Sequence, residues 1–295
     1  MSRVKHILWI ALLAMALLVS ACQKNARTTD ASAATLSAAE SVASAATLSA
    51  AESVASATTL SAAESVASAT TLSETVRVTL PEGVSFYEAA KLLEKNSVCT
   101  AKAFFDAAQN YEVKSFAVKN DPNRCYKFEG YLYPDTYEFY RGANAKAVLV
   151  EILNNYRAKS GLPSDETLIL ASMLEREARS AEHMAKVAAV LQNRLALGMK
   201  LQTDCTIHYV EKYIKPNPLV ASPERFAPLY NTYKCAALPA GPINSPGKQA
   251  LRAAQSPAQG MDGYLFYFFG NDNTNHYSKT YEEHEAQMKI YGVQY

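Results

Sequence analysis

The pattern of apolar and polar residues begins with a continuous apolar run over residues 7–19. This run follows the basic Arg3 and Lys5, and small residues lead from it to Cys22. The order is typical of a secretory signal, and the run is short for a membrane-spanning helix. We therefore predict a lipoprotein-type signal peptide over residues 1–22, with a lipidated Cys22 that anchors the mature chain to a membrane. An uncleaved anchor helix is the alternative, and both interpretations place the protein outside the cytoplasm, in the cell envelope.

The next segment repeats with a period of twelve, in the phrase ASAATLSAAESV that begins at Ala31. Alanine, serine and threonine dominate it, so few large apolar groups are available to offset the entropy of ordering the chain. The period is also shorter than a solenoid unit. We predict that residues 23–75 form a flexible stalk. A weak amphipathic coil is the alternative, because Leu36 and Val42 recur with the repeat.

Beyond the repeat, the periodicity predicts a small β-α-α-β unit. Residues 77–80 indicate a short strand, and Ser85 with Glu88 forms a capping box ahead of a helix over residues 86–95. A second helix is expected at residues 101–109, and a returning strand at 113–118.

The remainder is mainly helical. Residues 129–140 indicate extended chain with a turn, residues 201–238 are rich in loops, and residues 264–269 form a buried-type strand. The expected helices cover residues 144–159, 164–178 and 180–197, resume at 245, and end with 280–292. The predicted fold class is therefore α+β, with a β-α-α-β domain over residues 76–120 and a mainly helical α+β domain over residues 121–295.

Charge and histidine spacing exclude several functions. The net charge of +1 gives no electrostatic argument for nucleic acid as a partner. The five histidines are scattered and form no H-E-x-x-H or similar pattern, so neither a metal nor another cofactor is expected.

Four cysteines lie in the expected folded part and lack the C-x-x-C spacing of a zinc site. In an exported chain an even number of cysteines favours disulfides. We favour Cys99–Cys125 and Cys205–Cys235, which each close a local loop. Free buried thiols are the alternative.

Two glutamates on one predicted helix are the leading catalytic candidates. The carboxylates of Glu175 and Glu177 point roughly 200° apart on a helix, so only one can face a given cleft. Apolar neighbours one and two turns back from Glu175 favour a raised pKa, which a general acid needs near neutral pH. The alternative is that both glutamates are solvated and pair with Arg176 and Arg179.

Side chains suited to binding sugar follow on loops, namely Gln202, Asn231 and Tyr233. They are also ordinary turn residues.

Several phrases together resemble the YceG-like endolytic murein transglycosylases. In order along the chain they are EGYLYPDTYEF at 129–139, ILASMLEREA at 169–178, VLQNRLALGMKLQTD at 190–204, YNTY at 230–233, LPAGPI at 238–243 and P-G-x-x-A-L at 246–251. The resemblance implies a LysM-like domain at residues 76–120 and a transglycosylase domain at residues 121–295.

In this family interpretation Glu175 is the catalytic acid/base, and Glu177 is the other candidate. Glu175 would protonate the MurNAc–GlcNAc oxygen and then accept the proton of the MurNAc 6-hydroxyl, which gives a 1,6-anhydro-MurNAc end. Gln202, Asn231 and Tyr233 would position the sugars. The implied partners are peptidoglycan glycan strands and, as candidates, peptidoglycan synthases.

The sequence departs from the family in two places. Members usually begin with a transmembrane helix, where this chain has the lipoprotein-type signal, and they commonly have proline at the position of Cys205. Two other functions remain open: a non-catalytic peptidoglycan-binding lipoprotein, and a muramidase-type hydrolase in which Asp204 or Asp135 activates water.

Overall fold

The computed structural model describes residues 74–293. The predicted signal peptide, the predicted lipidation site Cys22 and residues 23–73 of the predicted stalk lie outside these residues, while Thr75 at the end of that stalk already belongs to the first strand. In the part of the chain that is described, no helix combines the length and apolar character needed to cross a membrane. The secondary structure mixes helices with two small sheets, so the α+β fold class is confirmed.

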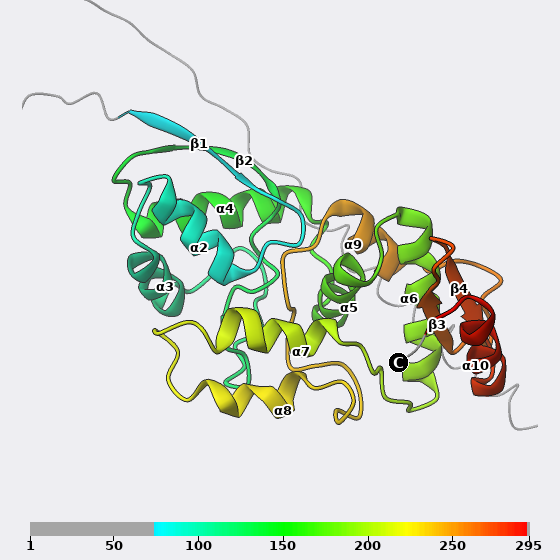
Figure 1. Cartoon of the computed structure of the whole chain (residues 1–295). Helices are drawn as coiled ribbons and strands as arrows, with labels where there is room; N and C mark the ends of the chain where they lie inside the picture. The colour runs from blue at the N-terminus through cyan, green and yellow to red at the C-terminus, as the bar shows by residue number, and fades with distance from the viewer. Residues whose placement is uncertain (1–73, 294–295) are drawn as a thin grey trace, which may run out of the picture. The chain divides into compact units, whose positions relative to one another are not determined.

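The β-α-α-β arrangement is present, but a different segment supplies its second strand. Strand β1 (Thr75–Leu80) leads into α2 (Phe86–Lys95) and α3 (Ala101–Asn110), and β1 pairs antiparallel with β2 (Asp135–Tyr140). Figure 1 shows the two strands side by side above these helices. The predicted strand at residues 113–118 is wrong, because this segment is irregular.

Residues 135–140 pair with β1 because buried and exposed residues alternate along β2. Tyr137 and Phe139 are buried and stack with ring centroids 5.6 Å apart, while Glu138 and Tyr140 between and beyond them are exposed. A two-residue period with one apolar face is what an antiparallel pair requires.

Most of the predicted helix starts are confirmed by capping hydrogen bonds, but the helix expected to resume at 245 begins at Lys248, after Gly247. The Ser85 hydroxyl accepts the Glu88 N–H at 3.1 Å, and the Glu88 carboxylate accepts the Ser85 N–H at 3.0 Å. Thr280 and Glu283 form the second capping box. Asparagine or serine caps begin the three helices of the middle of the chain, α4 (Ala145–Lys159), α5 (Asp165–Glu177) and α6 (Ala181–Ala196).

The segment expected to be loop-rich contains short helical pieces. They are α7 (Cys205–Tyr209), the π-helical turn η1 (Val210–Ile214), the 3-10 turn η2 (Pro223–Phe226) and α8 (Ala227–Tyr230). Helix α9 (Lys248–Gln255) precedes a hairpin of β3 (Phe266–Phe269) and β4 (Asn275–Ser278), and α10 (Tyr281–Ile290) follows. The expected strand at 264–269 is thus confirmed in β3.

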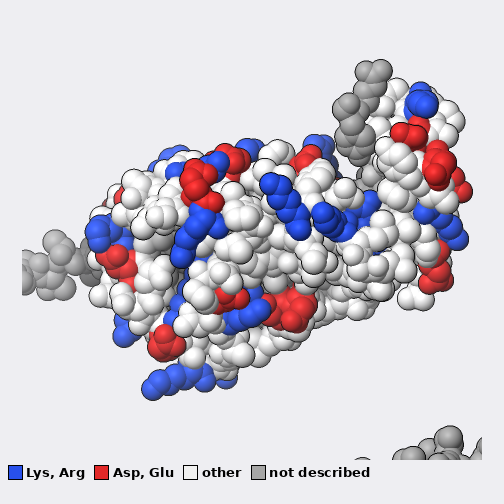
Figure 2. Space-filling view, turned by 90° about the horizontal axis from the view of Figure 1, so that it is seen from below, with Lys and Arg blue, Asp and Glu red and all other residues white. Residues whose placement is uncertain are grey.

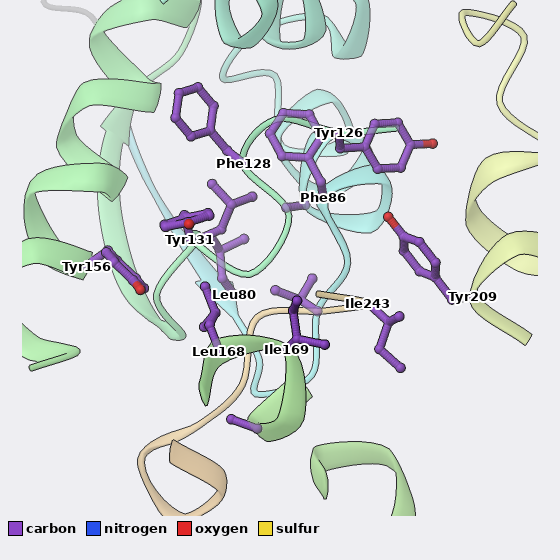
Figure 3. Close-up of a cluster of buried hydrophobic side chains, with 14 of the residues drawn as sticks. Leu80, Phe86, Tyr126, Phe128, Tyr131, Tyr156, Leu168, Ile169, Tyr209 and Ile243 are labelled. Atoms are coloured by element: carbon purple, nitrogen blue, oxygen red, sulfur yellow. The ribbon is translucent and has the colours of Figure 1, made fainter. Parts of the chain in front are cut away.

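Helix α5 lies at the centre of the described chain and is buried along most of its length. Every residue from Leu168 to Leu174 is buried, and the helix packs against α6 and α9 (Figure 1). Figure 3 shows Leu168 and Ile169 of α5 in the same cluster as Leu80 of β1 and Phe86 of α2. The β-α-α-β unit and the helical part therefore share one core, which fixes the end of α5 relative to the turn after β1.

A buried carboxyl joins these two parts. Glu129, only 2% exposed, accepts the Phe86 N–H at the start of α2 and the Tyr209 hydroxyl of α7, both at 2.9 Å. Burial raises the pKa of Glu129 to about 8, although the Phe86 N–H and the Tyr209 hydroxyl oppose the shift. Glu129 thus connects the N-terminal unit to the segment that follows α6.

Candidate active site

The last turn of α5 brings Glu175 and Glu177 out of the core. The helix ends at Glu177, directly after its buried run, so both side chains emerge at the same end of the helix. They face different surroundings, as the helical spacing predicts.

Glu175 faces the turn after β1 and the start of α9. Its Oε2 accepts the backbone N–H of Gly247 at 2.9 Å, and a Cβ placed on Gly83 would lie 3.4 Å from its Cγ. Burial raises the pKa of Glu175, opposed by the Gly247 N–H and reinforced by the nearby Glu82. Glu175 is therefore half-buried rather than solvated.

Arg176 extends between the two glutamates toward the same turn. Its Nη2 donates to the carbonyl of Gly83 at 2.7 Å and to the Tyr213 hydroxyl at 3.3 Å, and it lies 3.9 Å from a Glu88 oxygen. Arg176 thus holds the end of α5 against the turn and against η1.

Glu177 faces the other way, toward β3, α7 and two adjoining cavities. The Tyr267 hydroxyl of β3 donates to its Oε2 at 3.0 Å. One cavity, of about 270 Å³, lies against α7 and η1 and includes Cys205 and His208. The other, of about 650 Å³, lies against β3 and the start of α10. Glu177 and Asp204 line both cavities, so the two spaces meet at these carboxylates.

Two of the three predicted sugar-binding residues line the larger cavity. Gln202 and Tyr233 both belong to it, and the Tyr233 hydroxyl donates to Asp204 Oδ1 at 2.8 Å. Asn231 instead shapes the loop, because its Oδ1 accepts the Tyr233 N–H at 3.0 Å. Glu175 lines neither cavity. The structure therefore brings Gln202 and Tyr233 together with Glu177.

Buried threonines join the phrases QTD and NTY across the chain. The Thr232 hydroxyl accepts the Thr203 N–H and donates to the Thr203 carbonyl, both at 3.0 Å, and it lies 3.2 Å from the Thr206 hydroxyl. Gln202 has a φ of +53°, and its N–H donates to the Thr232 carbonyl at 3.1 Å. The occurrence of a threonine in both phrases was the available sequence signal for this contact.

Asn193 and Arg194, from the phrase QNR on α6, bind the chain that leads into β3 at the edge of the larger cavity. Asn193 Nδ2 donates to the carbonyls of Met261 and Tyr264, at 2.8 and 2.9 Å. The buried Arg194 donates to the carbonyls of Leu265 and Leu201, at 2.6 and 2.8 Å. Sequence reasoning did not single out Arg194 or Tyr267, because their partners are distant along the chain.

The four cysteines within residues 74–293 form no disulfide. Cys99, Cys125, Cys205 and Cys235 are free thiols, so both predicted bridges are absent and the alternative of free thiols holds. The two expected partners in the site have different neighbours: the half-buried Cys205 lies beside Glu177, while the Cys235 thiol lies 3.5 Å from the Pro228 carbonyl. Burial, together with the Glu177 charge, raises the pKa of Cys205 well above its usual range.

One face of the described chain shows no strong preference for one sign of charge. On the face in Figure 2, basic and acidic side chains are interspersed. Within residues 74–293, no group of three or more His, Cys, Asp and Glu side chains is arranged to hold a metal ion.

Comparison with known proteins identifies relatives across most of the chain. The model of the YceG-like family matches residues 24–290. An endolytic murein transglycosylase of Bacillus subtilis is 32% identical over 180 residues, which cover 57% of this chain and 49% of that protein. One of Streptococcus pneumoniae is 26% identical over 242 residues, which cover 72% of this chain and 44% of that protein. The chain thus spans about half the length of these curated relatives.

A solved structure shares the fold. The crystal structure of a YceG-like protein from Listeria monocytogenes superimposes with a TM-score of 0.59 and 27% sequence identity. The match covers 72% of this chain and 75% of that one.

Proposed function

The chain belongs to the YceG-like family, and from that premise we propose that it is an endolytic lytic transglycosylase that cleaves the glycan strands of peptidoglycan. The name of its relatives supports this activity. One structural observation carries the proposal: the end of α5 presents Glu175, a half-buried carboxyl group with a raised pKa, and two cavities adjoin the same helix end at Glu177. An enzyme that cuts inside a polymer needs space for sugars on both sides of the broken bond, and the two cavities provide it.

We propose Glu175 as the catalytic acid/base. Burial raises its pKa, as a general acid requires, and the Gly247 N–H binds its Oε2 at 2.9 Å. Glu177 is the second candidate for one specific reason, which is that it lines both cavities, the larger of which also contains Gln202 and Tyr233.

The proposed reaction uses one carboxyl group twice. The protonated Glu175 donates its proton to the oxygen of the MurNAc–GlcNAc bond as that bond breaks, and positive charge develops on the MurNAc ring. The Glu175 carboxylate then takes the proton of the MurNAc 6-hydroxyl while this oxygen bonds to the anomeric carbon. The proton returns to Glu175, no water is consumed, and the product is a 1,6-anhydro-MurNAc end.

Neighbouring groups have distinct roles in this scheme. The Gly247 N–H, bound to Glu175 Oε2, orients the carboxyl so that its other oxygen is available to the substrate. Gln202 and Tyr233 bind sugar groups in the larger cavity, and Asn231 acts through the position of Tyr233. In the hydrolase alternative, Asp204 is the better candidate for the carboxylate that activates water. Asp135 is already bound to Asn155 and Lys159 at the start of β2.

The proposal also covers the parts of the chain around the site. The β-α-α-β unit is a LysM-like domain that assists in holding glycan. A lipidated Cys22 anchors the enzyme to a membrane, with the folded part acting on peptidoglycan outside the cytoplasm. Peptidoglycan synthases are candidate partners there.

The decisive experiment treats purified peptidoglycan with the full-length protein and identifies the released glycan fragments by mass spectrometry. Wild type is compared with Glu177→Gln and Glu175→Gln, which remove one carboxylate each from the same helical turn. We expect internal anhydro ends from wild type, a loss of at least about a hundredfold in Glu175→Gln, and substantial activity in Glu177→Gln. The reverse order of the two variants would assign the acid/base role to Glu177.

Two other results would overturn the reaction itself. Reducing ends would establish hydrolysis, with Asp204 as the group to test next. Binding without cleavage by wild type would favour the peptidoglycan-binding lipoprotein.

A further inference from the structure

The turn after β1 belongs to the β-α-α-β unit, yet it lies directly against the end of α5. Its backbone pairs with the segment before α9: the Gly83 N–H donates to the Ser245 carbonyl at 2.9 Å, and the Ser245 N–H donates to the Val84 carbonyl at 2.8 Å. From the other side, Arg176 donates to the Gly83 carbonyl at 2.7 Å. Gly83, Val84 and Ser245 are all buried. These contacts fix the position of the turn beside Glu175.

Glu82 in this turn places a second carboxyl group next to that of Glu175. A Cβ placed on Gly247 would lie 2.0 Å from Glu82 Oε1 and 2.1 Å from its Cδ, so the Glu82 carboxyl occupies space that only a glycine leaves free. The N–H of the same Gly247 donates to Glu175 Oε2 at 2.9 Å. One glycine therefore lies against both carboxyl groups, which come from segments far apart along the chain.

The groups around Glu175 act on its proton in opposite directions. Burial raises the pKa of Glu175 and the Gly247 N–H lowers it, while the negative charge of Glu82 raises it further and the guanidinium of Arg176 lowers it. Glu88 of α2 lies 3.9 Å from Arg176 and faces that guanidinium. Solvent stabilises the charged form of the exposed Glu82, whereas burial stabilises the neutral form of the half-buried Glu175. Their environments thus favour the charge on Glu82 and the proton on Glu175.

We propose that Glu82 is a positioning residue of the active site, through which the turn of the β-α-α-β unit keeps the Glu175 carboxyl in its protonated, proton-donating form. This inference rests on the proposed function for the role of Glu175. Glu82 acts through its charge beside Gly247 and exchanges no proton with the substrate. The β-α-α-β unit therefore completes the catalytic centre as well as assisting in holding glycan.

The first test measures how kcat for the release of anhydro ends depends on pH, with full-length wild type, Glu82→Gln and Glu82→Asp. Glu82→Gln removes the charge and keeps the size of the side chain. Glu166→Gln is the matched control, because Glu166 is an exposed glutamate in the first turn of α5, at the opposite end of the helix from Glu175. Thermal unfolding of each variant checks that the fold is retained.

We expect the alkaline limb of the profile, where Glu175 loses its proton, to move to lower pH in Glu82→Gln. On that limb kcat should fall about two- to fivefold, the range typical of one partly exposed charge. Glu82→Asp keeps the charge and should restore the wild-type limb, and Glu166→Gln should follow wild type. An equal fall at every pH would show that Glu82 only supports the turn, and this result would overturn the proposal. A profile equal to that of Glu166→Gln would overturn it as well.

The second test does not depend on cleavage. In protein isotope-labelled at the glutamate carboxyl carbons, the NMR resonance of Glu175 is assigned by its absence from Glu175→Gln and is titrated in wild type and Glu82→Gln. We expect its midpoint to move to lower pH in Glu82→Gln. A moved midpoint without any cleavage by wild type would support the coupling of the two carboxyl groups and refute the proposed activity. Anhydro ends with an unmoved midpoint would support the activity and refute the role of Glu82.

Discussion

The buried carboxyl of Glu129 makes the stability of this protein depend on pH in a way that one substitution can remove. Its side chain is inaccessible to solvent and receives two hydrogen bonds, from the Phe86 N–H and the Tyr209 hydroxyl. Burial outweighs these donors and raises the pKa from 4.5 to about 8. The folded protein therefore keeps a proton on Glu129 through a pH range in which the unfolded chain has released it.

The sign and size of the effect follow from this difference. Between about pH 4.5 and pH 8 the folded state binds more protons than the unfolded state, so the free energy of unfolding falls as pH rises. The fall is about 1.4 kcal/mol for each pH unit, or roughly 2 to 3 kcal/mol between pH 5.5 and pH 7.5. Glu129→Gln lacks the titrating group and loses this component, whatever constant cost the amide adds.

Urea unfolding of wild type and Glu129→Gln at both pH values measures the effect. We expect the variant to gain about 2 to 3 kcal/mol relative to wild type on going from pH 5.5 to pH 7.5. Glu138→Gln, on the exposed side of β2, is the control and should differ from wild type by less than about 0.5 kcal/mol at each pH. A difference between Glu129→Gln and wild type that is the same at both pH values would refute the reasoning.

Two further predictions concern the backbone and the buried threonines. Gly130→Ala should destabilise the fold by about 2 to 3 kcal/mol in urea unfolding, because Gly130 has a φ of +88° and the new Cβ would lie 2.8 Å from Pro242 Cβ. Gly142→Ala, with a φ of +68° and open space around it, should lose only about 1 kcal/mol, and equal losses would contradict the steric argument. Thr232→Val should cost about 1 to 3 kcal/mol and raise KM, because it leaves the Thr203 N–H unpaired beside Gln202. Thr136→Val on exposed β2 is its control, and an unchanged midpoint and KM in Thr232→Val would exclude the proposed coupling.

The sequence was most informative where a structural signal is local. The helix starts at Ser85, Asn144, Ser164, Ser180 and Thr280 are confirmed, since each cap bonds to a backbone group within three residues of itself. The predictions that failed concern contacts between residues far apart along the chain. The partner of β1 lies at residues 135–140, because a short apolar segment at 113–118 gives no information about which strand completes the pair.

The same division applies to the candidate site. Helical periodicity by itself determined that Glu175 and Glu177 face opposite surroundings, and the phrases around Gln202 and Tyr233 indicated a sugar-binding loop pair. Only the tertiary structure decided which carboxylate meets that loop pair, because the positions of β3 and α7 relative to α5 set the cavity walls. It likewise decided the state of the thiols, since loop length alone does not fix where Cys205 and Cys235 point. Hydrogen bonds within one helical turn depend only on residues that are neighbours in the sequence. Cavities and strand pairs depend on how the whole chain packs.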